Sequence, residues 1–286
     1  MKVRAYAKVN LALDVVKKRD DGYHELEMIM APITLHDLIY INRIEKGIEI
    51  KTNSFKIPTD ERNIMYKVAK ILIERYHIPY GVKIQVYKHI PTQAGLAGGS
   101  ADGAAVLRAM NQMFNLNLSL EQLAEIGKEV GADIPFCIYE QMALVKGIGE
   151  KLEFIKSDWF CHLLLVKPKK GVSTKKSFSM LNLKTAQHPD ILKMKQGIEL
   201  SHDHMIVESL GNTLEAPSMK MVKDIEIIKQ EMLDLGFDGA LMSGSGSCVF
   251  GMTQDENILK KGYQYFKNKY PFVRTTKILR KEEEKY

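Results

Sequence analysis

The sequence is short of the residues that build disulfide frameworks and metal clusters. Its 286 residues include only three cysteines, Cys137, Cys161 and Cys248, all in apolar surroundings and without metal-site spacing. An odd count of this kind argues against a disulfide framework, so we expect a protein of the reducing cytoplasm. There is no run of about 18 apolar residues, which argues against a helical membrane span. The polar, strand-like start of the chain is not typical of a signal peptide.

A large excess of charge is also missing. The net charge is +6, which suits an anionic small substrate and would also permit weak nucleic-acid binding. The basic residues are spread along the chain, whereas a dedicated nucleic-acid protein usually concentrates them. We therefore expect no nucleic-acid and no membrane partner. The chain is long enough for one large domain or two closely packed ones, and it has no internal repeat or low-complexity linker.

Glycine is concentrated in residues 91–105, where Gly95, Gly98 and Gly99 lie within five positions. Such clustering lets the backbone adopt positive φ and approach a ligand closely. The spacing matches neither the Walker A loop nor the dinucleotide-binding fingerprint. Taken alone, the stretch could be a packing turn or a phosphate loop.

A helix is expected to follow this loop, with Ser100 as its N-cap and Asp102 in its first turn. Unpaired N–H groups at such a helix start attract phosphate.

Three further stretches contain polar residues or glycines in positions typical of a binding site. Alternation over residues 2–16 predicts a strand with Lys8 and Asn10 on the face opposite the apolar set, either a solvent-facing edge or a binding surface. Asp133 follows a glycine and precedes Ile-Pro, as a turn cap or a catalytic base would. Residues 239–251 form a second glycine–serine turn that enters a strand.

Together, residues 91–102, 131–136 and 239–251 resemble, in the same order, three motifs of the GHMP kinases, which phosphorylate small metabolites. The resemblance implies an α+β, two-lobed fold with mixed and antiparallel sheets and helices packed on them. It also implies an N-terminal ATP-binding domain over 1–155 and a C-terminal domain over 156–286, with the active site between them.

The resemblance implies ATP and Mg²⁺ as cofactors. It assigns nucleotide binding to Gly95, Leu96, Ala97, Gly98, Gly99, Ser100, Ala101, Asn63 and Lys88, with the Ser100 hydroxyl near the metal. Asn63 could instead be a surface residue of a first helical turn, and Lys88 a solvated strand end.

The loop departs from its commonest version at two positions, Gln93 and Ala97, where glycine or a small residue is frequent. The methyl group of Ala97 should be tolerated unless φ is positive there.

For catalysis, the resemblance makes Asp133 the base and Lys8 its neighbour, a cation that neutralises the transferring phosphoryl group. An aspartate near its ordinary pKa is ionised at neutral pH and can accept a hydroxyl proton.

Residues 22–26, Gly-Tyr-His-Glu-Leu, resemble one branch of the family, whose substrate carries a cytidine diphosphate group. There Tyr23 stacks on cytosine, His24 reads its edge, and Asn10 is a substrate contact. Thr174 and Phe178 fit a later segment whose aromatic residue closes on the base, although Phe178 could be a core residue. The implied reaction transfers the ATP γ-phosphoryl group to the 2-hydroxyl of 4-diphosphocytidyl-2-C-methyl-D-erythritol, in the non-mevalonate route to isoprenoid precursors.

Two rival interpretations stay open: a GHMP kinase for homoserine, mevalonate or a sugar, and a non-catalytic ligand-binding relative. We expect a monomer or a weak homodimer. Residues 212–215 resemble a family Asn-Asp-Leu-Glu segment in which Thr213 replaces the aspartate. His202 and His204 flank Asp203, for which a solvated loop is a simpler interpretation than a metal site.

The hydrophobic periodicity, together with residues that typically start or end helices and strands, predicts the remaining elements. Residues 28–57 read as several short antiparallel strands, and residues 147–150 as a hairpin turn. Helices are expected over 64–76, from the glycine loop to 115, and over 120–130, 191–198, 205–210, 219–235 and 258–269. Further strands are expected over 82–88, 163–166 and 273–279.

Overall fold

The structure, a computed structural model, describes residues 1–280. Its chain forms two compact units that interleave along the sequence. The first unit contains Met1–Ala7, Leu35–Thr92 and Ala97–Glu140, and the second contains Lys8–Thr34, Gln93–Leu96 and the chain from Gln141 onward. Strands β1 (Lys2–Lys18) and β2 (His24–Ile44) each contribute to both units. The compact units are not consecutive halves of the chain, so they do not test the domain boundary expected after residue 155, which stays a prediction.

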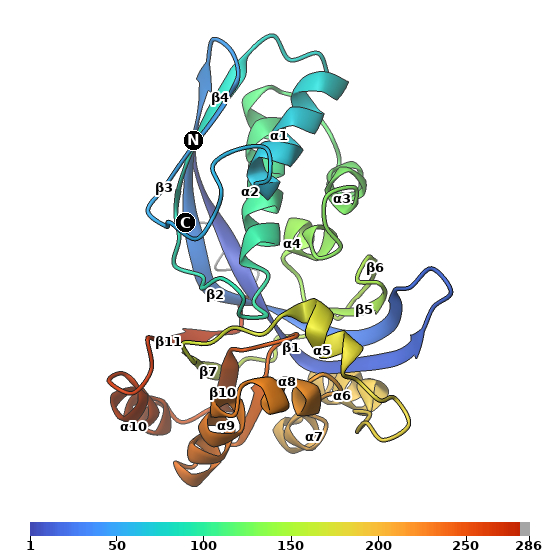
Figure 1. The fold of residues 1–286 in the computed structure, drawn as a ribbon, viewed down its shortest axis with the longest axis vertical. Coiled ribbons are helices and arrows are strands. Elements are labelled where there is room, and N and C mark those ends of the chain that lie inside the picture. Colours follow the sequence, from blue (N-terminus) through green and yellow to red (C-terminus); the bar gives the residue numbers. More distant parts are fainter. Residues whose placement is uncertain (281–286) are drawn as a thin grey trace. The chain divides into compact units, whose positions relative to one another are not determined.

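The first unit packs helices on one side of a sheet (Figure 1). Its elements beyond β1 and β2 are β3 (Ile48–Thr52), α1 (Ile64–Arg75), β4 (Gly81–Tyr87), α2 (Gly98–Met113), α3 (Leu120–Lys128) and α4 (Ile134–Tyr139). Strand β4 pairs antiparallel with β2 and parallel with β3. Helix α2 packs against α1, α3 and α4 and is buried along most of its length.

The expectation of several short antiparallel strands over 28–57 is wrong. Strand β2 runs unbroken for 21 residues, because its middle section is buried on both faces and contains no turn. The first positive φ after β2 is at Gly47, and β3 then pairs with β4 in parallel.

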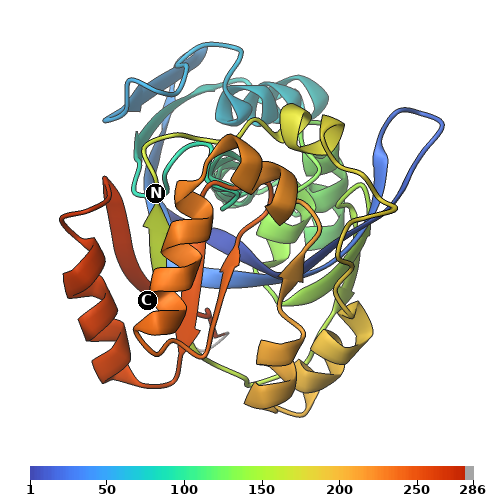
Figure 2. The ribbon, with the colours of Figure 1, turned by 60° about the horizontal axis from the view of Figure 1, so that its bottom comes forward.

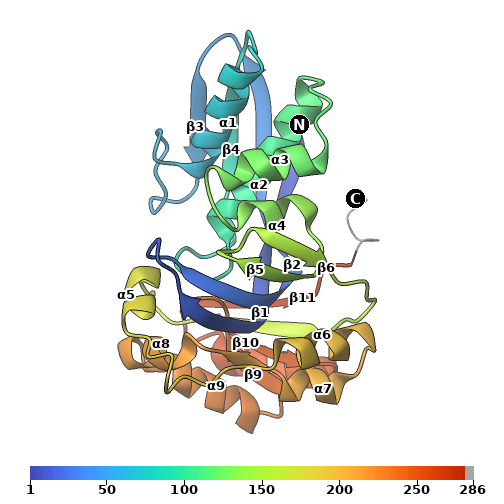
Figure 3. The ribbon, with the colours of Figure 1, turned by 90° about the vertical axis from the view of Figure 1, so that its right-hand side faces the viewer.

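The second unit contains a four-stranded antiparallel sheet in the order β11-β7-β10-β9. Beyond its parts of β1 and β2, the elements of this unit, including the four strands of that sheet, are β5 (Ala143–Gly147), β6 (Lys151–Phe154), β7 (His162–Lys167), α5 (Thr174–Ser179), α6 (Ile191–Glu199), α7 (Asp203–Glu208), β8 (Gly211–Asn212), α8 (Glu215–Met221), α9 (Asp224–Asp234), β9 (Gly239–Met242), β10 (Val249–Thr253), α10 (Glu256–Phe266) and β11 (Phe272–Lys277). Helices α9 and α10 pack on this sheet (Figure 2), and α5 lies beside α8 (Figure 3). The hairpin over 147–150 is confirmed by the β5–β6 pairing.

Most of the expected helices are confirmed, including the one that Ser119 caps reciprocally with Gln122. The single helix expected over 219–235 is wrong, because Val222 takes an extended conformation and separates α8 from α9. His202 is exposed in the connection between α6 and α7, where its ring nitrogen accepts the Met205 N–H and caps α7. Asp203 and His204 form the first turn of that helix. None of the helices in residues 1–280 combines the length and apolar composition that a bilayer crossing requires.

Candidate active site

The glycine loop alternates its backbone conformation. Positive φ occurs at every second residue, with 52° at Gln93, 74° at Gly95 and 55° at Ala97. Backbone that alternates in this way turns successive N–H groups toward one side and forms a concave site for anions. Helix α2 then begins at Gly98, whose Cβ, if present, would lie 2.9 Å from Ile90 Cγ2. Gly98 is therefore required for close packing rather than for positive φ.

Ser100 is not the N-cap that the sequence suggested. The cap is Ala97, whose left-handed backbone turns the chain into α2 and places Ser100 within the first turn. The methyl group at position 97 is consequently strained, because a left-handed conformation costs an L-residue about 1–2 kcal/mol.

We expect Ala97→Gly to increase the free energy of unfolding by up to about 1 kcal/mol, once the greater unfolded-state entropy of glycine is subtracted. Urea denaturation should show a higher midpoint with an unchanged slope. Ala105→Gly, in the buried interior of the same helix, is the control and should be destabilising by about 1 kcal/mol. An Ala97→Gly protein as destabilised as this control would contradict the strain at position 97.

Lys8 and Asn10 do not face solvent, so the solvent-edge interpretation is wrong. Lys8 is 4% exposed and Asn10 is fully buried, and the Lys8 ammonium donates to Asn10 Oδ1 at 2.6 Å. The Lys8 N–H also donates to the Leu96 carbonyl at 3.2 Å. Strand β1 is thereby joined to the glycine loop.

The second glycine–serine turn lies directly against this loop. Ser243 Oγ donates to the Gly95 carbonyl at 3.0 Å and accepts the Asn10 N–H at 3.3 Å. A Cβ on Gly95 would lie 1.9 Å from the Ser243 carbonyl oxygen, so the two backbones touch. Three segments far apart in sequence therefore meet within the second unit.

Residues 212–215 hold this turn in place, which the sequence did not reveal. The Asn212 amide donates to the carbonyls of Met242 and Gly244, both at 2.8 Å, and Glu215 Oε1 accepts the Met242 N–H at 3.0 Å. Thr213 is also buried, and its hydroxyl lies 2.8 Å from Asp14 Oδ1 on β1. Threonine at this position therefore ties the segment to β1.

The residues expected to hold cytosine are partly assembled. His24 opens β2, and its ring packs on Phe178 of α5 with centroids 4.8 Å apart and planes inclined by 31°. Burial, and to a lesser degree the positive charge of Lys18, lowers the pKa of His24, so the ring is neutral at pH 7 and offers one donor and one acceptor. Tyr23 is 62% exposed in the turn before β2, and Phe178 is half-buried rather than a core residue.

Hydroxyl groups link α5 to the glycine–serine turn. Thr174 is exposed, and its Oγ1 lies 2.8 Å from Ser245 Oγ. Beneath it, the buried hydroxyls of Ser177 and Ser218 are 2.9 Å apart, and Ser218 donates to the Ser245 carbonyl at 3.2 Å. The helix that carries Phe178 is therefore fastened to the turn that contacts Gly95.

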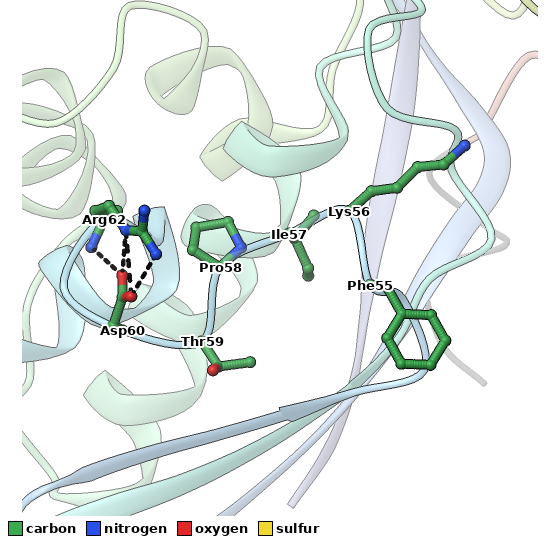
Figure 4. A pocket seen from close by; sticks show the side chains of 7 residues that line it. All are labelled: Phe55, Lys56, Ile57, Pro58, Thr59, Asp60 and Arg62. Carbon is green, nitrogen blue, oxygen red and sulfur yellow. Dashed lines mark hydrogen bonds and ion pairs between the residues drawn. The ribbon is translucent and has the colours of Figure 1, made fainter.

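In the first unit, Asn63 is not a surface residue. It is 7% exposed and caps α1, with its Oδ1 accepting the Met65 N–H at 2.8 Å and its amide donating to the Pro58 carbonyl at 2.6 Å. The loop just before it lines a hollow of about 460 Å³ (Figure 4). The lining residues are Phe55, Lys56, Ile57, Pro58, Thr59, Asp60 and Arg62.

The expectation of a solvated lysine at the end of β4 is also wrong. The Lys88 side chain is 8% exposed and forms ion pairs with Asp37 and Asp102. Burial raises the pKa of the Asp102 carboxyl, an effect that the adjacent Lys88 ammonium opposes. Sequence reasoning missed Asp37, although Asp37 lies on the same face of β2 as the buried residues Ile39 and Ile41.

Asp133 stands at the N-cap position of α4 and is half-buried. Among the described residues of this turn, its carboxylate makes no capping hydrogen bond, so the turn-cap interpretation does not explain it. The carboxylate thus has capacity to accept a proton or a hydrogen bond from elsewhere.

Two family models match the chain, the GHMP kinases N terminal domain over residues 63–141 and the GHMP kinases C terminal over residues 182–271. The 4-diphosphocytidyl-2-C-methyl-D-erythritol kinase of Clostridium botulinum (strain Alaska E43 / Type E3) is 44% identical over 280 residues, 98% of this chain and 100% of its own. The chain belongs to the GHMP kinase family.

Other comparisons agree on the branch. The 4-diphosphocytidyl-2-C-methyl-D-erythritol kinase of Exiguobacterium sibiricum is 46% identical over 263 residues, 91% of this chain and 92% of its own. A crystal structure of 4-(cytidine 5'-diphospho)-2C-methyl-D-erythritol kinase matches with a TM-score of 0.84 and 27% identity, covering 97% of this chain and 99% of that one. The predicted family, cytidyl branch and α+β fold are therefore confirmed, and the chain is an ATP-dependent kinase.

Proposed function

We propose that this kinase transfers the γ-phosphoryl group of ATP to the 2-hydroxyl of 4-diphosphocytidyl-2-C-methyl-D-erythritol, a step of the non-mevalonate route to isoprenoid precursors. The observation that carries the proposal is the near-full-length identity of 44–46% to curated kinases of that name. The link from Lys8 and Asn10 through Ser243 to Gly95 supports it, because it joins the motifs that such a reaction needs.

We assign the nucleotide phosphates to the backbone N–H groups of residues 95–101, and the rest of the nucleotide to Asn63 and Lys88. The alternating positive φ of the loop supports this assignment. Among residues 1–280, no three histidines, cysteines or acidic residues form a metal cluster. This suits Mg²⁺, which is usually held by substrate phosphates and few protein groups. Ser100 would supply a hydroxyl, and the ion would neutralise phosphate charge.

For the chemical step, the oxygen of the acceptor hydroxyl attacks the γ-phosphorus, and Asp133 accepts the proton that this hydroxyl loses. The bond between this phosphorus and the bridging oxygen breaks, and ADP leaves with the electron pair. Lys8 offsets negative charge on the transferring group. In such reactions, placement and charge neutralisation supply most of the acceleration.

The cytidine end of the substrate is assigned to Tyr23 and Phe178 as stacking partners and to His24 as the reader of its hydrogen-bonding edge, with Asn10 and Thr174 as polar contacts. The lowered pKa of His24 supports this role, because a neutral imidazole can both donate and accept.

Tyr23→Ala should weaken binding of the cytidylated substrate by about 1–3 kcal/mol, the usual effect of losing one base–aromatic stack. The affinity for ATP should be unchanged. Tyr40→Ala removes another exposed aromatic ring, distant in sequence from the assigned cytidine residues, and should leave both values unchanged. If the KM for the cytidylated substrate in Tyr23→Ala equalled that of the parent protein, Tyr23 would be no part of the base site.

The function is tested with a coupled assay of ADP release across candidate acceptors: the cytidylated erythritol, homoserine, mevalonate and a sugar. We expect turnover with the first alone. Turnover with another acceptor would identify a different GHMP kinase, and ATP binding without any turnover would identify a non-catalytic relative.

A further inference from the structure

Asp37, Lys88 and Asp102 form a buried cluster in the first unit, at the junction of strand β4 and helix α2. The side chains of Asp37 and Asp102 are 0% and 4% exposed. We propose that Asp37 and Asp102 are positioning residues for ATP binding. Both aspartates act through Lys88, and together they hold the first turn of α2 where it binds phosphate. This rests on the proposed function, since it assumes that α2 receives the nucleotide.

Asp37 organises the chain that leads to the loop. Its Oδ1 accepts the backbone N–H groups of His89 and, at 2.8 Å, Ile90, while its Oδ2 accepts from the Lys88 ammonium. Both carboxylate oxygens are therefore engaged by donors from three consecutive residues. A charged acceptor strengthens each of these hydrogen bonds.

Two of these residues, Lys88 and Ile90, contact the start of α2. A Cβ on Gly98 would lie 2.9 Å from Ile90 Cγ2 and 3.6 Å from Lys88 Nζ, so Gly98 rests directly on them. One turn further along, Asp102 Oδ2 accepts from Lys88. Helix α2 is thus held at its first residue by packing and at its second turn by an ion pair. Displacing Ile90 and Lys88 would shift the N–H groups of the loop, and small shifts in a positioning element have large effects on a bound reactant.

The two carboxylates are not equivalent. Asp102 Oδ1 is buried and has no hydrogen-bond partner among residues 1–280, whereas both oxygens of Asp37 are used. Asparagine at position 102 would keep one oxygen for Lys88 and place its NH₂ group where Oδ1 already has no partner, so it would break no existing hydrogen bond. Asparagine at position 37 would turn its NH₂ group toward either the backbone donors or the ammonium, leaving a donor without an acceptor.

The test compares these two isosteric variants. We expect Asp37→Asn to raise the KM for ATP and the dissociation constant of ADP by roughly 10-fold or more. The KM for the acceptor should stay within about twofold, because the proposed effect is confined to the nucleotide end. Asp102→Asn should change the KM for ATP less than about threefold, whereas Asp102→Ala, which loses the Lys88 contact, should raise it more than Asp102→Asn does. Glu140→Gln is the matched control: Glu140 pairs with Arg108 in the later part of α2, so its loss should lower the melting temperature without weakening ADP binding.

Calorimetric ADP binding separates the failure of this proposal from that of the proposed function. If the parent protein does not bind ADP, the proposed function fails. If the parent binds ADP and a folded Asp37→Asn binds it equally well, the positioning role is overturned. Should Asp37→Asn not fold, the comparison of Asp102→Asn with Asp102→Ala decides, and equal ADP affinities would overturn the proposal.

Discussion

Asp133→Asn should lower turnover by roughly 100-fold or more while leaving ATP and acceptor binding nearly intact, because an amide cannot act as a general base. The change keeps the size and shape of the side chain. Among the described residues around the start of α4, the carboxylate makes no capping hydrogen bond, so its removal should not destabilise this helix. Single-turnover measurements with saturating substrates would report the chemical step directly, and thermal melting would report folding.

Asp190→Asn provides the matched control for this variant. Asp190 caps α6 by accepting the Lys193 N–H at 2.9 Å, and asparagine caps a helix about as well as aspartate. This control should therefore keep both stability and turnover. Parental turnover in Asp133→Asn would remove Asp133 from the mechanism.

The second large effect is expected at Gly95. An added Cβ would meet the carbonyl oxygen and carbon of Ser243 at 1.9 and 2.7 Å, and these are backbone atoms that cannot rotate away. We expect Gly95→Ala to lose about 2–5 kcal/mol of the free energy of unfolding, from left-handed strain and overpacking together. The KM for ATP should rise by roughly 10-fold or more as the loop is displaced. Urea denaturation and initial-rate kinetics measure the two effects.

Gly47 separates the strain from the steric contact. It has a φ of +83°, but an added Cβ would have nothing within 4 Å. Gly47→Ala should therefore cost only the conformational strain of about 1–2 kcal/mol and leave the KM for ATP unchanged. Equal destabilisation in the two variants would contradict the close approach of Gly95 to Ser243.

Local periodicity was sufficient to predict the first strand, the helix after the glycine loop and the capping of α3. It could not predict that Lys8 and Asn10 would be buried, because alternation does not distinguish a solvated face from one covered by distant segments. The start of α2 was also misplaced. Its cap depends on a left-handed backbone at Ala97, a conformation for which alanine gives no local signal.

The site was predicted mainly from motifs, and the parts that were missed lie outside them. Asp37 lies on the buried face of its strand together with Ile39 and Ile41, so a charged residue among these alternating apolar positions was an available signal. Asp102 lies within the glycine-loop motif, but it was expected in the first turn of the helix, whereas it is buried in the second turn beside Lys88. The Asn212 amide donates to the Met242 and Gly244 carbonyls, and Glu215 accepts the Met242 N–H. These hydrogen bonds had no such signal, because they join residues about 30 positions apart through tertiary packing alone.

The central claim is that the alternating backbone of the glycine loop receives the phosphates of ATP. A crystal structure of this protein with a non-hydrolysable ATP analogue tests it most directly. We expect the β- and γ-phosphates to accept hydrogen bonds from backbone N–H groups of residues 95–101, with the γ-phosphate facing the Asp133 side. Phosphates bound far from both Gly98 and Asp133 would contradict the account.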